Sequence, residues 1–266
     1  MALACLGAAA AAQTRMADTS TTDNAARGSA SHDRANDRYC HQGGAARLVL
    51  IDITTPYDDA DKLVIEAMLR SVFAAVKGGD RITVRTIADS YTRSERLIER
   101  CAPYCAAEGV AARLLGCNDG VIRADRDTVQ QDILATLQKR LSHFAELKQS
   151  DILRTIDAAA REDYRPPGPV HLYIYSDLLE NSELLARPAL FGFTAPAPAL
   201  TNLQKMRLIP LLRDAEIRVA GVGRSDAPDR RPLGIRDLNG LREFWTAYFQ
   251  AAGARHVSIG LGITRD

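Results

Sequence analysis

Several features that would indicate a nucleic-acid or membrane partner are missing from this sequence. The formal net charge of the 266 residues is only +1, so no strong field of one sign attracts nucleic acid or an anionic membrane surface. No apolar run approaches the roughly 20 residues that a membrane-spanning helix requires. We therefore expect neither a nucleic-acid partner nor a transmembrane segment.

The motifs of several common enzyme classes are absent as well. The sequence contains no Gly-x-x-x-x-Gly-Lys-Ser/Thr and no Gly-x-Ser-x-Gly, which argues against a Walker-type nucleotide site and a hydrolase nucleophile elbow. Gly221 and Gly223 follow a predicted strand, but the third glycine of a dinucleotide fingerprint is missing. The five histidines show no spacing typical of metal ligands.

The N-terminal region has almost no large apolar residues. Residues 1–12 are small and apolar, like the core of a secretory signal peptide, although the basic start is missing. The stretch up to residue 42 is too polar to offset the entropy of an ordered chain. We expect a leader and a disordered spacer over residues 1–42 and a periplasmic or secreted protein. An Ala-rich tail on a cytoplasmic protein is the alternative.

Four of the five cysteines lie beyond the leader, at positions 40, 101, 105 and 117. An even number of cysteines in an exported protein predicts disulfides, whose pairing the sequence does not reveal. Buried free thiols and a metal site are the alternatives. Three of the four fall in residues 89–127, which we interpret as an insertion.

Strand-like and helix-like patterns alternate over residues 43–266. Strands are predicted at residues 46–52, 81–88, 170–175, 216–222 and 256–260, and helices at 58–77, 128–147, 150–162, 202–215 and 238–252. Residues 187–199 are expected to form a loop. This alternation predicts one Rossmann-like α/β domain, doubly wound, with a mostly parallel sheet and helices on both faces.

Two acids and two hydroxyls stand at the predicted ends of these elements. Asp52 ends the first strand and Thr54 follows it, Ser150 opens a helix, and Asp177 follows the strand at 170–175. Ligands of open α/β sheets bind beyond the carboxyl ends of the strands, so these side chains are expected to meet there. Carboxylate and hydroxyl oxygens suit Mg²⁺ or Mn²⁺.

This set of residues resembles the metal-ion-dependent adhesion site of von Willebrand factor A domains. That family has Asp-x-Ser-x-Ser after the first strand, then a Thr at a helix start and an Asp at the end of a later strand. Asp52 matches the first Asp, Thr54 the first Ser, Ser150 the Thr and Asp177 the last Asp. Pro56 replaces the second Ser, so the site would be one ligand short.

The resemblance implies a non-enzymatic protein-binding or assembly module, with an acidic side chain of a partner protein completing the metal site. One alternative is a metal-dependent phosphohydrolase that uses Asp52. Asp52 followed by Thr54 resembles the nucleophile motif of haloacid-dehalogenase-like phosphotransferases, but Thr54 stands where that family has a second Asp as acid/base. The other alternative is a metal-free structural subunit of a larger complex.

Each site residue also has a purely structural interpretation. Asp52 could bond its own backbone in a turn, and Ser150 could cap the helix that follows it. Ser176 or Asp177 could cap a helix that begins near Leu178.

Overall fold

The computed structural model describes residues 39–40, 44–105, 110, 118–142, 147–163, 168–185, 190, 196–224 and 233–262. All of them fall within one unit of the chain, Asn36–Asp266. The other unit, Met1–Ala35, lies outside the described residues, and the predicted leader and most of the spacer lie there with it.

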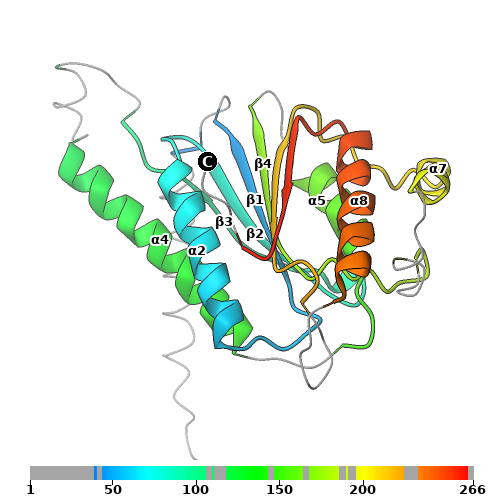
Figure 1. Cartoon of the computed structure of the whole chain (residues 1–266). Helices are drawn as coiled ribbons and strands as arrows, with labels where there is room; N and C mark the ends of the chain where they lie inside the picture. The colour runs from blue at the N-terminus through cyan, green and yellow to red at the C-terminus, as the bar shows by residue number, and fades with distance from the viewer. Residues whose placement is uncertain are drawn as a thin grey trace, which may run out of the picture. The chain divides into compact units, whose positions relative to one another are not determined.

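A six-stranded sheet forms the centre of the described fold, with strand order β3-β2-β1-β4-β5-β6 (Figure 1). The strands are β1 (Ala46–Asp52), β2 (Arg81–Ile87), β3 (Arg96–Cys101), β4 (Val170–Tyr175), β5 (Glu216–Ala220) and β6 (His256–Ile259). Neighbouring strands are parallel except β2 and β3, which are antiparallel. The predicted mostly parallel α/β sheet is confirmed.

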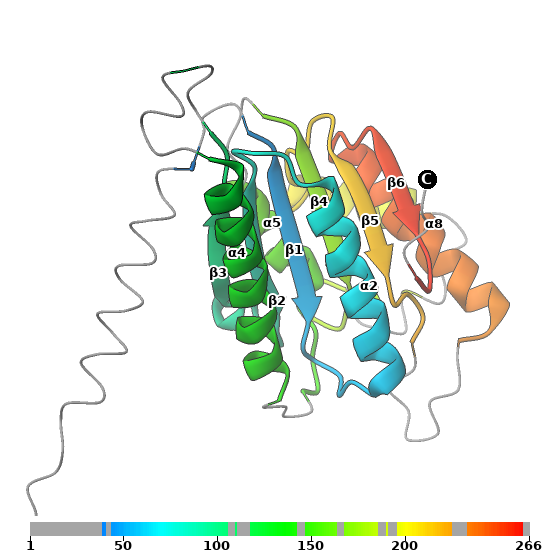
Figure 2. The same ribbon diagram turned by 90° about the vertical axis from the view of Figure 1, so that its left-hand side faces the viewer.

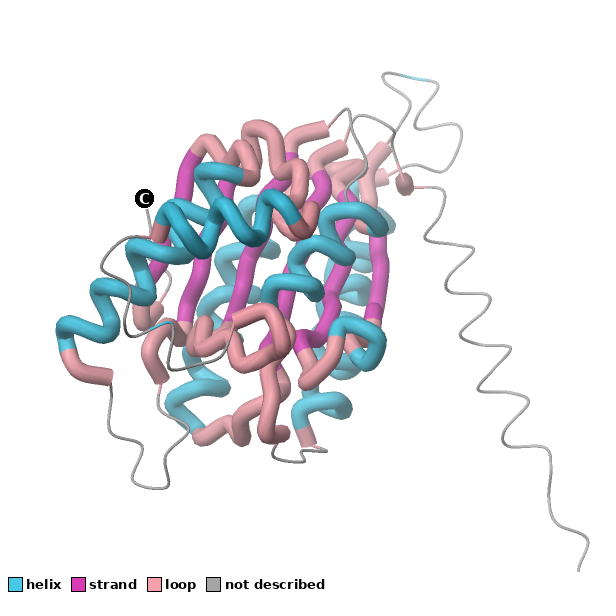
Figure 3. Tube along the Cα trace, turned by 90° about the vertical axis from the view of Figure 1, so that its right-hand side faces the viewer, coloured by secondary structure: helices cyan, strands magenta, loops and turns pink. Residues whose placement is uncertain are grey.

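Helices cover both faces of the sheet, as a doubly wound fold requires. One face carries α2 (Asp59–Ala75) and α4 (Asp119–Leu141), seen in front of the sheet in Figure 2. The other face carries α5 (Ile152–Glu162), α7 (Ala197–Lys205) and α8 (Ile235–Ala251), seen in Figure 3. A short 3₁₀ helix, η1 (Tyr91–Arg93), precedes β3.

Strand β1 is buried on both faces, which explains its unbroken apolar sequence. Leu48 and Leu50 pack into the core formed with α5 and α8, whereas Val49 and Ile51 pack into the core formed with α2 and α4. Side chains alternate across a strand, so each core receives every second residue. A central strand of this kind needs apolar residues throughout.

The predicted insertion at 89–127 contains more regular structure than we expected. It holds η1, the antiparallel edge strand β3 and the first turns of α4. In β3 only Ile98 and Cys101 are buried, so no apolar run indicated a strand. The buried residues of α4 begin at Val129, so its periodicity becomes visible only ten residues after the helix starts at Asp119.

The bounds predicted for a helix over residues 202–215 are also wrong. Helix α7 begins at Ala197, within the stretch 187–199 that we expected to be a loop, and ends at Lys205. There Arg207 adopts the left-handed conformation with φ of 57°, and the amide of Leu208 donates to the carbonyl of Leu203 at 2.9 Å. These are the features of a Schellman motif, whose left-handed residue is usually glycine. An arginine there costs about 1–2 kcal/mol of conformational energy.

A disulfide joins Cys40 to Cys101, the last residue of β3. Cys105 is also disulfide-bonded, while Cys117 lies outside the described residues. The predicted disulfides are therefore confirmed for this part of the chain. None of the helices in the described part combines the length and apolar character needed to span a bilayer.

Candidate cation site at the carboxyl edge of the sheet

The strand order reverses between β1 and β4, because the chain passes from β1 outward to β3 and then returns to the other side of β1. Such a switch point leaves a crevice beyond the carboxyl ends of the two strands, where α/β proteins bind their ligands. Asp52 is the last residue of β1, and Ser176 and Asp177 directly follow β4. The fold therefore places these side chains at the switch point.

Asp52 is fully enclosed and accepts three hydrogen bonds. Its Oδ1 accepts from the backbone amide of Thr54 at 3.0 Å and from the Thr54 hydroxyl at 2.6 Å. Its Oδ2 accepts from the Ser176 hydroxyl at 2.6 Å, across the β1–β4 boundary. The structural interpretation of Asp52 as a turn residue is thus correct, and the same bonds fix the direction of the Thr54 hydroxyl oxygen.

Asp177 organises the loop that follows β4. Its Oδ1 accepts from the amide of Leu179 at 2.9 Å, and the Ser176 hydroxyl accepts from the amide of Leu178 at 2.9 Å. Leu178 has a positive φ of 60°, and no helix begins there, contrary to the capping interpretation. The carbonyl of Asp177 accepts from the amide of Gly223 at 3.0 Å, which joins this loop to the one after β5.

Ser150 meets the Asp177 loop through its backbone. It forms an isolated β-bridge with Asn181, with N–O distances of 3.2 and 3.0 Å. Its side-chain hydroxyl is buried and has no hydrogen-bond partner among the described residues. Leaving a hydroxyl buried without a partner costs about 1–3 kcal/mol, so this oxygen requires an explanation.

Helix α5 is capped by Glu180, not by Ser150 as one interpretation of the sequence proposed. The Oε2 atom of Glu180 accepts from the amides of Ile152 and Leu153 at 2.7 and 3.0 Å. Burial raises the pKa of Glu180 from 4.5 to about 8, although these bonds and one from the Ser182 hydroxyl oppose the shift. The sequence offered no signal for this cap, since Glu180 lies 28 residues beyond the helix start.

A small cavity of about 30 Å³ joins three of the four predicted site residues. It is lined by Thr54, Thr55, Leu147, Lys148, Gln149, Ser150, Asp177, Leu179 and Asn181. Asp52 lies directly behind Thr54, to which it is hydrogen-bonded. Lys148 and Gln149 are exposed and form the outer part of the lining. The cavity is large enough for one water molecule or one ion, because about 10–15 Å³ of such space is enough to hold a water.

The donor set of this cavity suits a hard cation. Thr54 and Ser150 offer hydroxyl oxygens and Asp177 a carboxylate, while Asp52 adds a second negative charge behind them. Mg²⁺ is commonly held by one or two carboxylates and retains several waters. Among the described residues no three His, Cys, Asp or Glu side chains form a metal cluster. A cation site that uses hydroxyl oxygens as ligands would not need a cluster of three such side chains.

A second polar group, which the sequence did not indicate, lies beside this edge. Arg224 follows β5, pairs with Asp61 at 2.8 Å and stacks on the rings of Tyr57 and Tyr175 at 4.7 and 5.5 Å. The hydroxyl of Tyr175 donates to Asp61 at 2.7 Å. Burial alone would lower the pKa of Arg224, but neighbouring groups, including Asp61 and Asp177, raise it. Arg224 therefore stays charged close to the candidate site.

The scan of the chain against models of known protein families and the search of curated proteins found no match. The resemblance to von Willebrand factor A domains therefore stays a prediction.

Proposed function

We propose that this protein is a non-enzymatic binding module whose carboxyl edge holds Mg²⁺ or Mn²⁺ and captures an acidic side chain of a partner protein. In this proposal Thr54, Ser150 and Asp177 supply oxygens to the cation, directly or through water, and Asp52 orients Thr54. The cation, when bound, offers an open coordination position to a carboxylate oxygen of the partner. We also propose that the domain is related to von Willebrand factor A domains.

The Ser150 hydroxyl is the observation that carries this proposal. Its oxygen is buried without a hydrogen-bond partner in the described part of the chain, and Ser150 lines the same small cavity as Thr54 and Asp177. A cation or its bound water in that cavity would satisfy the hydroxyl.

Cation binding should raise the melting temperature of the wild type and not that of Ser150→Ala. For a Kd of about 1 mM, 10 mM cation would add about 1.4 kcal/mol of stability, a shift of about 3–6 °C. Differential scanning fluorimetry with Mg²⁺, Mn²⁺ and EDTA measures it. Because the hydroxyl of Ser150 has no partner, its loss should not destabilise the metal-free protein.

Thr83→Val is a matched control for this experiment. The Thr83 hydroxyl is likewise buried without a partner among the described residues, but it lies within β2. This variant should keep the full shift. If the cation raised the melting temperature of wild type and Ser150→Ala equally, it would bind elsewhere. If it did not raise the melting temperature of the wild type, the metal-free structural subunit would be the remaining interpretation.

The phosphohydrolase alternative is tested separately, with p-nitrophenyl phosphate as substrate. The hydroxyl of Thr54 already donates to Asp52, and a hydroxyl is a poor general acid at neutral pH. We therefore expect no turnover that depends on Asp52. Hydrolysis by the wild type that Asp52→Asn abolishes would replace the binding proposal with the enzymatic one.

The Cys40–Cys101 disulfide supports an extracytoplasmic location for this module, since disulfides persist mainly in oxidising compartments. A periplasmic or secreted protein is the form that we propose.

A further inference from the structure

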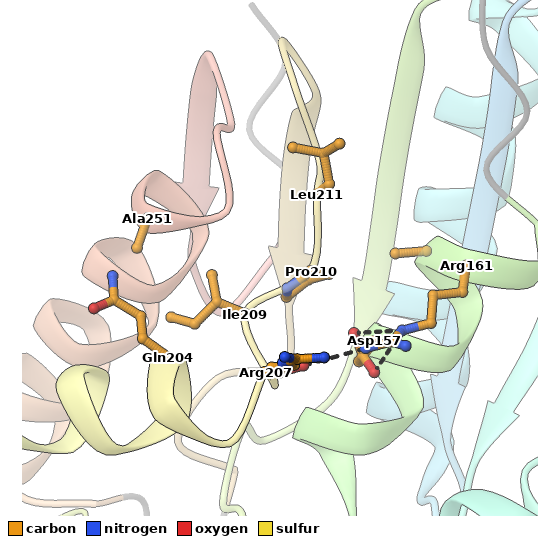
Figure 4. A pocket seen from close by; sticks show the side chains of 9 residues that line it. Asp157, Arg161, Gln204, Arg207, Ile209, Pro210, Leu211 and Ala251 are labelled. Carbon is orange, nitrogen blue, oxygen red and sulfur yellow. Dashed lines mark hydrogen bonds and ion pairs between the residues drawn. The ribbon is translucent and has the colours of Figure 1, made fainter.

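A second cavity, of about 700 Å³, lies between α5, α7, α8 and the segment that leads from α7 to β5 (Figure 4). It is lined by Asp157, Ala160, Arg161, Gln204, Arg207, Ile209, Pro210, Leu211 and Ala251. None of these residues lines the candidate cation site. The volume falls within the range of small-molecule sites, which is about 300–1,000 Å³.

One part of the lining is apolar and incompletely covered by the protein. Ile209, Pro210 and Leu211 are consecutive, and Leu211 remains 65% exposed. A leucine in water forgoes the free energy that its burial would release. The apolar body of a ligand lying on this segment would recover it.

The other part of the lining has a positive charge that the described protein does not neutralise. Arg161 pairs with Asp157 at 3.0 Å and donates to the backbone carbonyl of Arg207 at 3.2 Å. The Asp157 charge is therefore balanced by Arg161, as the dashed contacts in Figure 4 indicate. The exposed guanidinium of Arg207 has no ion-pair partner among the described residues. The charged side chains that line the cavity therefore sum to a net charge of +1.

The backbone of Arg207 adopts a conformation that carries a steric penalty for residues with a side chain. This residue is the left-handed member of the Schellman motif that ends α7, with φ of 57°. Glycine takes this conformation without steric cost. The arginine therefore places its guanidinium beside the cavity at a cost in stability that glycine would avoid.

We infer that this cavity binds a small amphiphile with a single anionic head group, such as a carboxylate or sulfonate, and an apolar body. The head group pairs with Arg207, whose guanidinium can form two parallel hydrogen bonds with a planar carboxylate. The apolar body covers Ile209 and Leu211. This site is independent of the proposed cation site and of its function.

Anilinonaphthalene sulfonate, a fluorescent amphiphile with one negative charge, is a suitable probe for the full-length chain. We expect saturable binding to the wild type and displacement by decanoate. Arg207→Gly should weaken binding at least about tenfold, because it removes a charge-assisted hydrogen bond. The same variant should melt at the same or a higher temperature, since glycine suits the left-handed position.

Two further variants sharpen the result. Leu211→Ser should weaken binding without unfolding the protein, because this side chain is already largely exposed. Arg70→Ala removes an exposed arginine from α2, on the opposite face of the sheet, and should bind the probe like the wild type. The inference is overturned by an absence of saturable binding, by unchanged binding to Arg207→Gly, or by decanol displacing the probe as well as decanoate.

Discussion

At the scale of single residues, short polar side chains at the carboxyl edge of the sheet form hydrogen bonds with each other and with nearby backbone amides. The Ser176 hydroxyl joins two segments of this edge. It donates to Asp52 at 2.6 Å and accepts from the amide of Leu178 at 2.9 Å. This hydroxyl thus connects the end of β1 to the loop after β4, although neither the acids nor the adhesion-site pattern indicated it.

Ser176→Ala should lower the free energy of unfolding by about 1–3 kcal/mol, because it leaves a buried carboxylate oxygen and a buried amide without a partner. Urea denaturation measures the loss. Thr83→Val, which removes a buried hydroxyl without a partner among the described residues, should be neutral or stabilising. If Ser176→Ala cost no more than Thr83→Val, the bond between β1 and β4 would be of no energetic importance.

Glu180 should make stability depend on pH. Burial raises its pKa from 4.5 to about 8, so between these values the native state binds more protons than the unfolded state. The contribution of this carboxyl group is fully present near pH 4.5 and is lost as the pH rises towards 8. In Glu180→Gln the group is neutral at every pH.

We therefore expect the stability of the wild type, relative to Glu180→Gln, to fall steadily from pH 5 to pH 8 in urea denaturation series. Parallel pH profiles for the two proteins would contradict the raised pKa.

Ser150 and Asp177, which are far apart in the sequence, line one cavity with Thr54, and this much of the site could be predicted from the ends of the elements. The predicted role of these residues as cation ligands remains a prediction. Glu180 and Arg224 could not be foreseen. Their roles depend on contacts between distant segments, and nothing in their local sequence distinguishes them from solvated charges.

At the scale of elements, the sequence predicted β1, β2, β4, β5 and β6 closely and missed β3, one of the two edge strands. β1 and β4 are central and buried, so their sequences show it. β3 has charged residues at Arg96, Glu99 and Arg100 and lies at an edge of the sheet, and α4 begins with turns that contact little of the core. The burial that defines these elements comes from the tertiary structure.

The Cys40–Cys101 disulfide ties the segment before β1 to the end of the edge strand β3. The two cysteines are 61 residues apart, so the chain-entropy model assigns the bond about 4 kcal/mol. Replacing both by serine should lower the free energy of unfolding by about 2–5 kcal/mol.

Denaturation of the wild type with and without reductant, beside the double serine variant, measures this contribution. The reduced wild type and the variant should agree if Cys105 adds little. Equal stability of the oxidised wild type and the variant would mean that the crosslink does not constrain the unfolded chain.

At the scale of the whole described unit, the strand order explains why the predicted residues meet at all. The reversal between β1 and β4 leaves the carboxyl ends of both strands open, and Asp52, Ser176 and Asp177 lie there. The alternation of strands and helices predicted this class of fold. The sequence did not reveal the cavity between α5, α7 and α8, because its lining combines residues of three helices with an irregular segment.

The single tryptophan of the chain lies next to the loop that carries Asp177. Trp245 is fully buried, and its indole Nε1 donates to the carbonyl of Leu178 at 2.9 Å. The emission of an indole depends on its hydrogen bonding and local field, so the protein contains its own optical reporter of that loop. Titration with Mg²⁺ should change the emission intensity or wavelength of the wild type and leave that of Ser150→Ala constant. Constant emission alongside a higher melting temperature would place the bound cation away from this reporter.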